Sequence, residues 1–351
     1  MKKLIYLIVA IEALSLIIAG CGIPVVPPTE QSNTGNLTKG ISINVPADYA
    51  TIQDAIDNAS NGDIIYVHEG TYSECIVIDG VDLSLIAVGD VTIALSVPVC
   101  PGHHDTIQIY NSTCTIDGFT VEGGYCGIYA RGMYFMNETE VDVTIRNNTM
   151  IKYEKGGIAV NGDLAIGQIY NNTITGGGPL GVPAFAQNGI QIGYGATGTI
   201  QRNAVEGNWY TGSDWTACGI LIFEANDVIV QGNSVKSSET GIAIEAWGRY
   251  FSSASSNKIV SNTIDGSEWG ISVAAEDKYD DVSANNNKVV NNIIEAESGN
   301  IGIYVGVDDE NSISYSATAE NNKIIHNQIS GYDTSIDDTG IASKVHVNVV
   351  E

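Results

Sequence analysis

The stretch Asn257–Ala275, NKIVSNTIDGSEWGISVAA, contains both elements that repeat along this chain. Asn262 begins an Asn-x-apolar element, and Gly270 begins a Gly-Ile-x-(Val/Ile) element. The Asn element recurs at Asn148, Asn172, Asn203, Asn233, Asn262, Asn292 and Asn327. The Gly-Ile element recurs at Gly157, Gly189, Gly219, Gly241, Gly270 and Gly302, with weaker copies at Gly127 and Gly340. The two series alternate strictly, with steps of 22 to 38 residues, which is the pattern of a solenoid.

Each repeat holds short runs of alternating apolar residues separated by Gly, Asn, Ser and Asp, which predicts strands and turns rather than helices. A unit this small cannot bury its own apolar face, so copies must stack on one another. We therefore predict an all-β right-handed parallel β-helix of roughly nine to eleven coils, with Ile and Val ladders inside. A β-sandwich would also have many short strands, but it would not explain the constant spacing. The recurrent asparagines are expected to stack at a tight bend and to bond the backbone of the next coil.

The segment before the repeats predicts a short helix that caps the open end of the solenoid. Ile52, Ala55, Ile56 and Ala59 fall on one helical face, and Thr51 stands where an N-cap is expected. Such a helix would cover apolar surface and unpaired strand edges at the first coil.

Residues 46–74, PADYATIQDAIDNASNGDIIYVHEGTYSE, resemble the opening of pectin-lyase-like β-helix proteins, including pectin methylesterases. The resemblance extends over residues 41–345 and implies a right-handed parallel β-helix that binds or acts on polysaccharides. The family's catalytic motifs do not follow. The aspartates and arginine of the methylesterases have no match, nor do the elements of pectate lyases, polygalacturonases or alginate epimerases. The resemblance therefore implies a fold without specifying a reaction.

The first residues are typical of an export signal. Lys2 and Lys3 precede an apolar stretch, and Ile18-Ala19-Gly20-Cys21 resembles a bacterial lipobox with Cys21 as the lipidated residue. A membrane span is the alternative, but the stretch is short and carries Glu12. We thus divide the chain into a signal peptide (1–20), a lipidated Cys and flexible linker (21–41), and the β-helix domain (42–351), and expect it at the cell surface or the outer face of a membrane.

The charge of the chain narrows its partners. Only 16% of the residues are charged, yet the net charge is −26. So few Lys and Arg residues cannot neutralise nucleic-acid phosphates, which excludes nucleic acid as a partner. They cannot neutralise anionic lipid headgroups either, so we expect membrane association only through the lipid on Cys21. Neutral glycans and divalent cations remain, and polyuronates would be repelled unless calcium bridged them.

Counting from the repeated glycines places acidic and aromatic residues at one turn of successive coils. This flank predicts a sugar-binding surface, because aromatic rings stack on sugar C–H faces and carboxylates accept hydroxyl hydrogens. The predicted binding residues are Asp163, Tyr194, Trp209, Trp215, Trp247 and Trp269. Glu224, Glu245 and Arg249 are weak catalytic candidates, since carboxylates on adjacent coils can reach glycosidase spacing. Solvent-exposed surface residues are the plainer interpretation of each.

Two further hypotheses use the same flank. Glu276, Asp277, Asp308 and Asp309 could hold Ca²⁺, which prefers oxygen ligands. The scarce basic residues Arg131, Lys152, Lys155 and Arg249 fall near it as well, as clamps on a substrate carboxylate or as partners in salt bridges. We predict a polysaccharide-binding surface lipoprotein. The alternatives are a polysaccharide-active enzyme, either a hydrolase or a calcium-dependent lyase, and a structural spacer.

Overall fold

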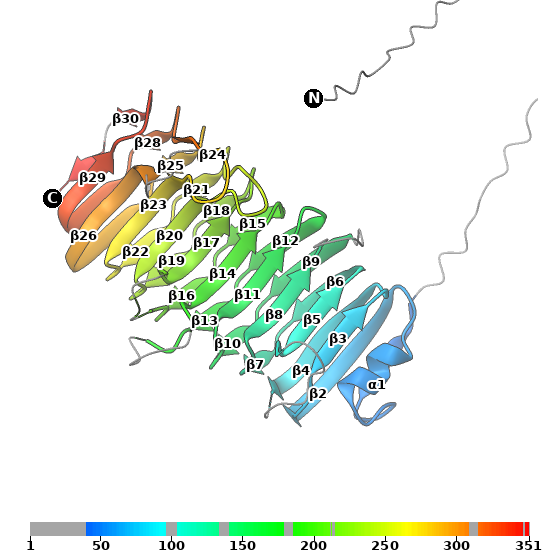
Figure 1. The fold of residues 1–351 in the computed structure, drawn as a ribbon. Coiled ribbons are helices and arrows are strands. Elements are labelled where there is room, and N and C mark those ends of the chain that lie inside the picture. The colour runs from blue at the N-terminus through cyan, green and yellow to red at the C-terminus, as the bar shows by residue number, and fades with distance from the viewer. Residues whose placement is uncertain are drawn as a thin grey trace, which may run out of the picture. The chain divides into compact units, whose positions relative to one another are not determined.

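The computed structural model describes residues 40–95, 104–132, 140–178, 185–210, 212, 215–308, 315–346 and 348–350. Within Lys39–Glu351, which is one compact unit, the chain winds into stacked coils (Figure 1). Each coil contributes strands to up to three faces, and every strand pairs in parallel with its counterpart in the next coil.

The first face contains β1 (Ser42–Val45), β2 (Asp63–Tyr72), β4 (Leu83–Ala94), β6 (Ser112–Asp117), β9 (Val141–Arg146), β12 (Ala165–Tyr170), β15 (Thr197–Gln201), β18 (Ile229–Gln231), β21 (Lys258–Val260), β25 (Lys288–Val290), β28 (Lys323–Ile325) and β30 (Lys344–His346). These strands pair in that order through eleven successive steps among the described residues. The all-β fold and the predicted coil number are therefore confirmed.

The second face contains β7 (Thr120–Glu122), β10 (Thr149–Ile151), β13 (Thr173–Thr175), β16 (Ala204–Glu206), β19 (Ser234–Lys236), β22 (Thr263–Asp265), β26 (Ile293–Asp308), β29 (Gln328–Asp338) and β31 (Val349–Val350). The third face contains β3 (Ile76–Asp79), β5 (Ile107–Tyr110), β8 (Cys126–Arg131), β11 (Gly156–Asn161), β14 (Asn188–Gly193), β17 (Cys218–Phe223), β20 (Thr240–Ala246) and β23 (Trp269–Glu276). The long strands β26 and β29 continue from the second face into the third. A small separate sheet joins β24 (Val282–Ser283) to β27 (Ala317–Thr318).

The predicted capping helix is present as α1 (Ile52–Asp57). The Thr51 hydroxyl accepts a hydrogen bond from the Asp54 amide at 3.1 Å, as expected of an N-cap. Ile52, Ala55 and Ile56 are buried against the first coil. The carboxylate of Glu74 additionally accepts the backbone amides of Ile52 and Gln53, which ties the start of the helix to the next coil.

The two residues of the Gly-Ile element have separate roles in the third face. Its isoleucines point inward and stack in register, and all of them are fully buried: Ile158, Ile190, Ile220, Ile242, Ile271 and Ile303. Its glycines lie where the coils approach most closely. A Cβ on Gly189 would lie 2.6 Å from the carbonyl oxygen of Gly219 and 2.4 Å from a methyl of Val205. Any larger residue would push neighbouring coils apart.

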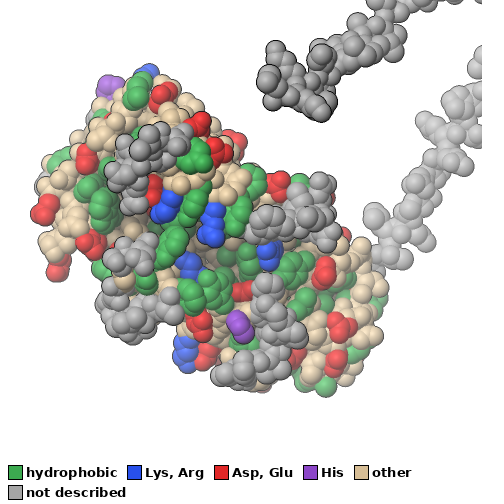
Figure 2. Space-filling view, viewed as in Figure 1, with side chains coloured by type: hydrophobic (Ala, Val, Ile, Leu, Met, Phe, Trp, Pro, Cys, Tyr) green, Lys and Arg blue, Asp and Glu red, His purple; other side chains and the backbone are tan. Residues whose placement is uncertain are grey.

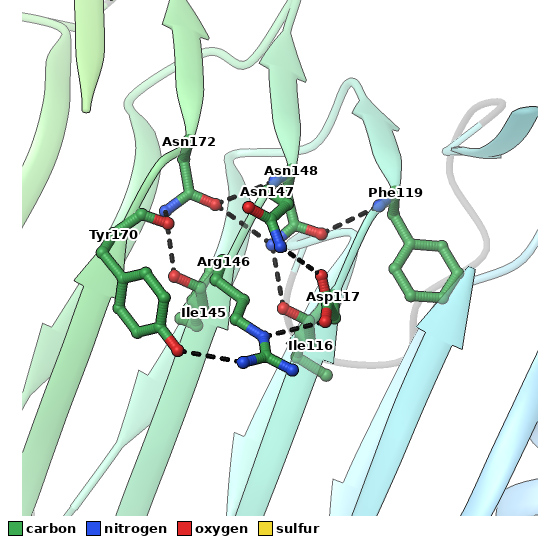
Figure 3. A network of polar contacts seen from close by, with 9 residues as sticks. All are labelled: Ile116, Asp117, Phe119, Ile145, Arg146, Asn147, Asn148, Tyr170 and Asn172. Atoms are coloured by element: carbon green, nitrogen blue, oxygen red, sulfur yellow. Dashed lines mark hydrogen bonds and ion pairs between the residues drawn. The ribbon is translucent and has the colours of Figure 1, made fainter. Parts of the chain in front are cut away.

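The seven asparagines form the predicted ladder, and each is at most 2% exposed. Along it, the backbone amide of each Asn donates to the side-chain oxygen of the Asn one coil later, as between Asn148 and Asn172 at 3.0 Å (Figure 3). The residue before each ladder position, such as Asn147 at φ 57°, adopts the left-handed conformation that forms the bend. A second ladder, Asn257, Asn287 and Asn322, was not predicted.

Candidate functional site

A cleft of about 680 Å³ lies on the outer side of the third face. Its floor comes from outward-facing residues of β14, β17, β20 and β23, and its walls come from the turns on either side of these strands. The lining residues are Tyr125, Lys155, Phe185, Ala186, Asn188, Gln191, Tyr194, Tyr210, Trp215, Thr216, Leu221, Phe223, Glu245, Trp247, Arg249, Glu276 and Lys278. Its volume falls in the range of small-molecule sites.

One side of the cleft is an aromatic wall of five rings. The ring centre of Tyr250, at the edge of the wall, lies 5.5 Å from that of Tyr194. The ring centres of Tyr194 and Phe223 are 5.2 Å apart. Phe223 packs edge to face on Trp247 with ring centres 5.0 Å apart. Trp247 stacks on Trp215 with ring centres 5.3 Å apart and an interplanar angle of 28°. Phe223 packs into a small hydrophobic cluster separate from the main core, so the wall is anchored from below. Trp215 is 44% exposed, which leaves aromatic surface available to a ligand.

The charges in the cleft are mixed. Three lining residues are basic (Lys155, Arg249 and Lys278) and two are acidic (Glu245 and Glu276). Lys278 lies 3.1 Å from the Glu276 carboxylate and 4.7 Å from the centre of the Trp247 ring. The cleft is therefore not the acidic surface that the sequence predicted. Figure 2 shows Lys and Arg side chains along the middle of this face among hydrophobic ones, with acidic side chains mostly toward its edges.

Lys155 is the most enclosed of the three bases. It lies just before β11, and its ammonium group donates to the carbonyl oxygen of Ala186. Burial lowers the pKa of Lys155, while the negative charge of Glu245 acts in the opposite direction. Lys155 and Glu245 both line the cleft, which therefore contains an acid and an amine whose pKa is lowered by burial.

Where β14 forms the floor of the cleft, its side chains are joined by hydrogen bonds between amide groups. The Asn188 side chain donates to Gln191 at 3.1 Å, and Gln191 donates to Asn161 at 3.0 Å. Nearby, Tyr125 and Phe185 meet edge to face at 5.0 Å. The cleft thus combines flat apolar surfaces with fixed hydrogen-bonding groups.

Glu224 does not line the cleft but lies beneath its edge. It is fully buried, and its carboxylate accepts three backbone amides, from Arg249 at 2.6 Å and from Tyr250 and Phe251 at 3.1 Å. Burial raises the pKa of Glu224, and these hydrogen bonds act in the opposite direction. Glu224 therefore positions the segment that carries Arg249 and Tyr250, and this geometry gives it no access to a substrate.

The family model described as right handed beta helix region matches residues 105–279 and 186–329. The chain belongs to the right-handed β-helix family. No curated protein sequence matches this β-helix protein significantly.

Two solved structures with similar folds are a mutant of the periplasmic alginate epimerase AlgG and the catalytic domain of a GH87 α-1,3-glucanase variant in complex with tetrasaccharides. The epimerase has 14% identity and a TM-score of 0.54, over 88% of this chain and 84% of that chain. The glucanase has 14% identity and a TM-score of 0.50, over 93% of this chain and 68% of that chain. At this identity the likeness shows the fold alone.

The predicted site residues of this β-helix protein divide into two groups. Tyr194, Trp215, Trp247, Glu245 and Arg249 come together in the cleft. Three other predicted binding residues lie outside it. Asp163 is exposed and packs beside Gly195 but does not line the cleft. Trp209 donates to the Ser237 carbonyl, and Trp269 packs edge to face with Tyr304.

Sequence reasoning missed several cleft residues, including Asn188, Gln191 and Lys278. The signal was available for Gln191, because it lies between the buried Ile190 and Ile192, where alternation turns its side chain outward. Asn188 has the parity of the inward isoleucines, so alternation does not predict its place in the cleft lining. Lys278 lies in the turn after β23, where no periodicity operates.

The calcium hypothesis remains a prediction. In the part of the chain that the structure describes, no three His, Cys, Asp or Glu residues gather as a metal site. Glu276 pairs with Lys278 instead. Asp277 is 5% exposed, and its Oδ1 has no hydrogen-bond partner. Asp309 and the side chain of Asp308 lie outside the described residues.

The predicted signal peptide and the lipidation site, Cys21, also lie outside the described residues. Among the residues that are described, no helix is long and apolar enough to cross a membrane. Cys75 is disulfide-bonded, whereas Cys114, Cys126 and Cys218 are buried free thiols.

Proposed function

We propose that this protein is exported and holds a polysaccharide chain in the cleft of its third face. The observation that carries the proposal is the aromatic wall, in which five rings continue from Tyr250 to Trp215 and end in an exposed indole. Pyranose rings present flat C–H faces that stack on such rings, and their hydroxyls pair with fixed amides and charged groups.

The cleft lining also supplies the polar partners that a sugar needs. Asn188 and Gln191 present amide groups, while Glu245, Arg249 and Lys155 present charged ones. Because the lining includes three bases and two acids, the cleft suits neutral sugars and also sugars that carry a carboxylate. The preference for neutral glycans, which rested on the net charge of the chain, does not extend to this cleft.

The similar folds support a carbohydrate role by analogy. Alginate epimerase and α-1,3-glucanase are names of proteins that act on polysaccharides, and the glucanase structure contains tetrasaccharides. Export fits the same analogy, since the epimerase is described as periplasmic. We further propose that Cys21 carries a lipid that retains the protein at a membrane surface, on the strength of the lipobox-like sequence.

The purified protein should be applied to an array of neutral and acidic polysaccharides, and the affinity of any bound glycan should then be measured by titration. We expect Trp247→Ala to weaken binding about thirtyfold or more, the effect of a central aromatic contact. Tyr315→Ala is the matched control, because Tyr315 is 43% exposed and lies outside the cleft. Equal binding by both variants would refute the proposal.

An enzyme is the second candidate function, and the presence of both Lys155 and Glu245 in the cleft lining favours it. An amine whose pKa is lowered by burial is a better base at neutral pH, and a carboxylate across a cleft can act as an acid or a base. Incubation of each bound glycan with and without EDTA, followed by assays for new reducing ends and unsaturated products, tests this. Binding without product formation would leave the protein as a binder.

A further inference from the structure

Four lysines stand in one column on the outside of the first face, away from the cleft. The register pairs Lys258 of β21 with Lys288 of β25, then Lys323 of β28, then Lys344 of β30. Their neighbours Ile259, Val289 and Ile324 are buried, which turns the first three lysines outward, and Lys344 in the last of these strands is exposed. The four ammonium groups therefore project from the same side of successive coils, which are spaced about 4.8 Å apart.

The column is not neutralised by the protein. Among the described residues, none of these four lysines forms an ion pair. Their strands, KIV, KVV, KII and KVH, contain no acidic residue. Lys236 of β19 shows the usual arrangement, because its register partners in the coils on either side are Glu206 and Asp265.

This concentration of charge is unusual for the chain. It has 15 Lys and Arg against 41 Asp and Glu, and four of those 15 stand in this one column. Like charges directly opposite one another on adjacent strands are destabilising. An ordinary solvated surface on so acidic a chain would place acids beside them. The geometry fits a ligand that supplies the missing negative charges.

We propose that this lysine column binds a linear anionic polysaccharide that lies along the axis of the coils. A glycan with a carboxylate on every sugar repeats its charge at about the length of one ring, which is comparable to the coil spacing. The adjacent outward column, Val260, Val290, Ile325 and His346, would contact the apolar faces of the sugars. The site is separate from the cleft and does not depend on the function proposed for it.

A linear polymer fits the column better than an anionic membrane does. A membrane presents a broad plane of negative charge, and a chain of net charge −26 would meet it with acidic residues as well as with the column. A single polymer chain can contact the column alone. Nucleic acid is a poorer fit because a duplex needs basic residues over a wider surface.

The test uses the full chain with polygalacturonate as the probe and its fully methyl-esterified form as the neutral counterpart, titrated at about 0.15 M salt. We expect Lys288→Gln combined with Lys323→Gln to weaken binding about tenfold or more, since each change removes a charge-assisted contact. Lys288→Arg combined with Lys323→Arg should retain binding, and the neutral polymer should not bind at the column. Lys236→Gln is the matched control, and circular dichroism checks that each variant is folded.

Several outcomes would overturn the proposal. These are no binding of polygalacturonate by the unaltered protein, equal binding by the Gln and Arg double variants, or loss of binding only when Trp247 in the cleft is changed. Binding of the unaltered protein to phosphatidylglycerol vesicles but not to the polymer would assign the column to a membrane instead. Failure of Trp247→Ala to affect any glycan would count against the cleft while leaving the column intact.

Discussion

Glu224 gives the sharpest test of how the cleft is built, because sequence reasoning made it a catalytic candidate and the structure makes it a positioning residue. The perturbation is Glu224→Gln, which keeps the size of the side chain and removes the charge. The glutamine has one acceptor oxygen, so it cannot accept all three amides that the carboxylate now accepts from Arg249, Tyr250 and Phe251.

The magnitude follows from these three bonds. If the glutamine oxygen takes the position that accepts Tyr250 and Phe251, its NH₂ group faces the Arg249 amide, and that donor is left unpaired at about 1–3 kcal/mol. The two remaining bonds lose charge assistance, at about 1 kcal/mol each. The neutral glutamine also avoids the free-energy cost of burying a charge, a cost that is reflected in the raised pKa of Glu224, and this gain offsets part of the loss. We expect a net loss of about 1–4 kcal/mol in the free energy of unfolding.

Urea unfolding measures this loss, and glycan titration measures its effect on the cleft. The variant should bind more weakly, because the segment from Arg249 to Phe251 is no longer held. Glu297→Gln is the matched control, since Glu297 is exposed and lies outside the cleft. If Glu224→Gln unfolds like the unaltered protein, binds glycan with full affinity and yet abolishes turnover, then Glu224 acts in catalysis and the positioning argument is wrong.

Three further predictions address the Asn ladder, the lysine column and the buried base Lys155. Asn203→Ala should lower the unfolding free energy by about 2–6 kcal/mol, because it leaves the Asn172 amide and the Ile169 carbonyl buried without partners. A loss below about 1 kcal/mol would contradict the ladder's structural role. Lys288→Gln should raise the unfolding free energy at low salt by about 1–2 kcal/mol, from two neighbouring charges about 4.8 Å away at the dielectric constant of water, and a loss of stability would refute the repulsion. Lys155→Met should gain stability relative to the unaltered protein as the pH falls below 10.5. The reason is that a lowered pKa means that the folded state binds the proton of Lys155 less tightly than the unfolded state does. Parallel pH profiles of the unfolding free energy, measured in urea, would rule this out.

The fold could be predicted because its determinants repeat in the sequence. Each Gly-Ile marks a close approach between coils where a Cβ has no room, as at Gly189. Each ladder Asn, such as Asn172, satisfies backbone groups that no other residue of its size would satisfy at that bend. The helix α1 followed from a single amphipathic pattern with its cap at Thr51.

The cleft could be predicted only in part, because its residues are set by strand parity and by turn conformation together. Residues four positions after the glycine point outward on successive coils, as Phe223 and Glu245 do. Counting five positions from Gly219 gives Glu224, where the chain turns with φ 50° and the side chain is buried. Coil lengths of 22 to 38 residues change these turns from one repeat to the next.

The lysine column could have been found from sequence, because three of its members stand in the repeated motif Asn-Lys followed by two β-branched residues, at Lys258, Lys288 and Lys323. The pattern was hidden by the composition of the chain. A net charge of −26 does not reveal that four of the 15 bases stand together.

Net charge is therefore a poor guide to the partners of a molecule with this geometry. At physiological ionic strength, charges more than about 8 Å apart are largely screened from one another. A ligand on the column lies within that distance of adjacent lysines, which are about 4.8 Å apart, while most of the acidic residues lie farther along or around the coils. The same reasoning applies inside the cleft, where Lys155 and Arg249 are among the lining residues. Local charge at each surface is therefore the better guide to its ligand, and both proposals predict that acidic glycans bind.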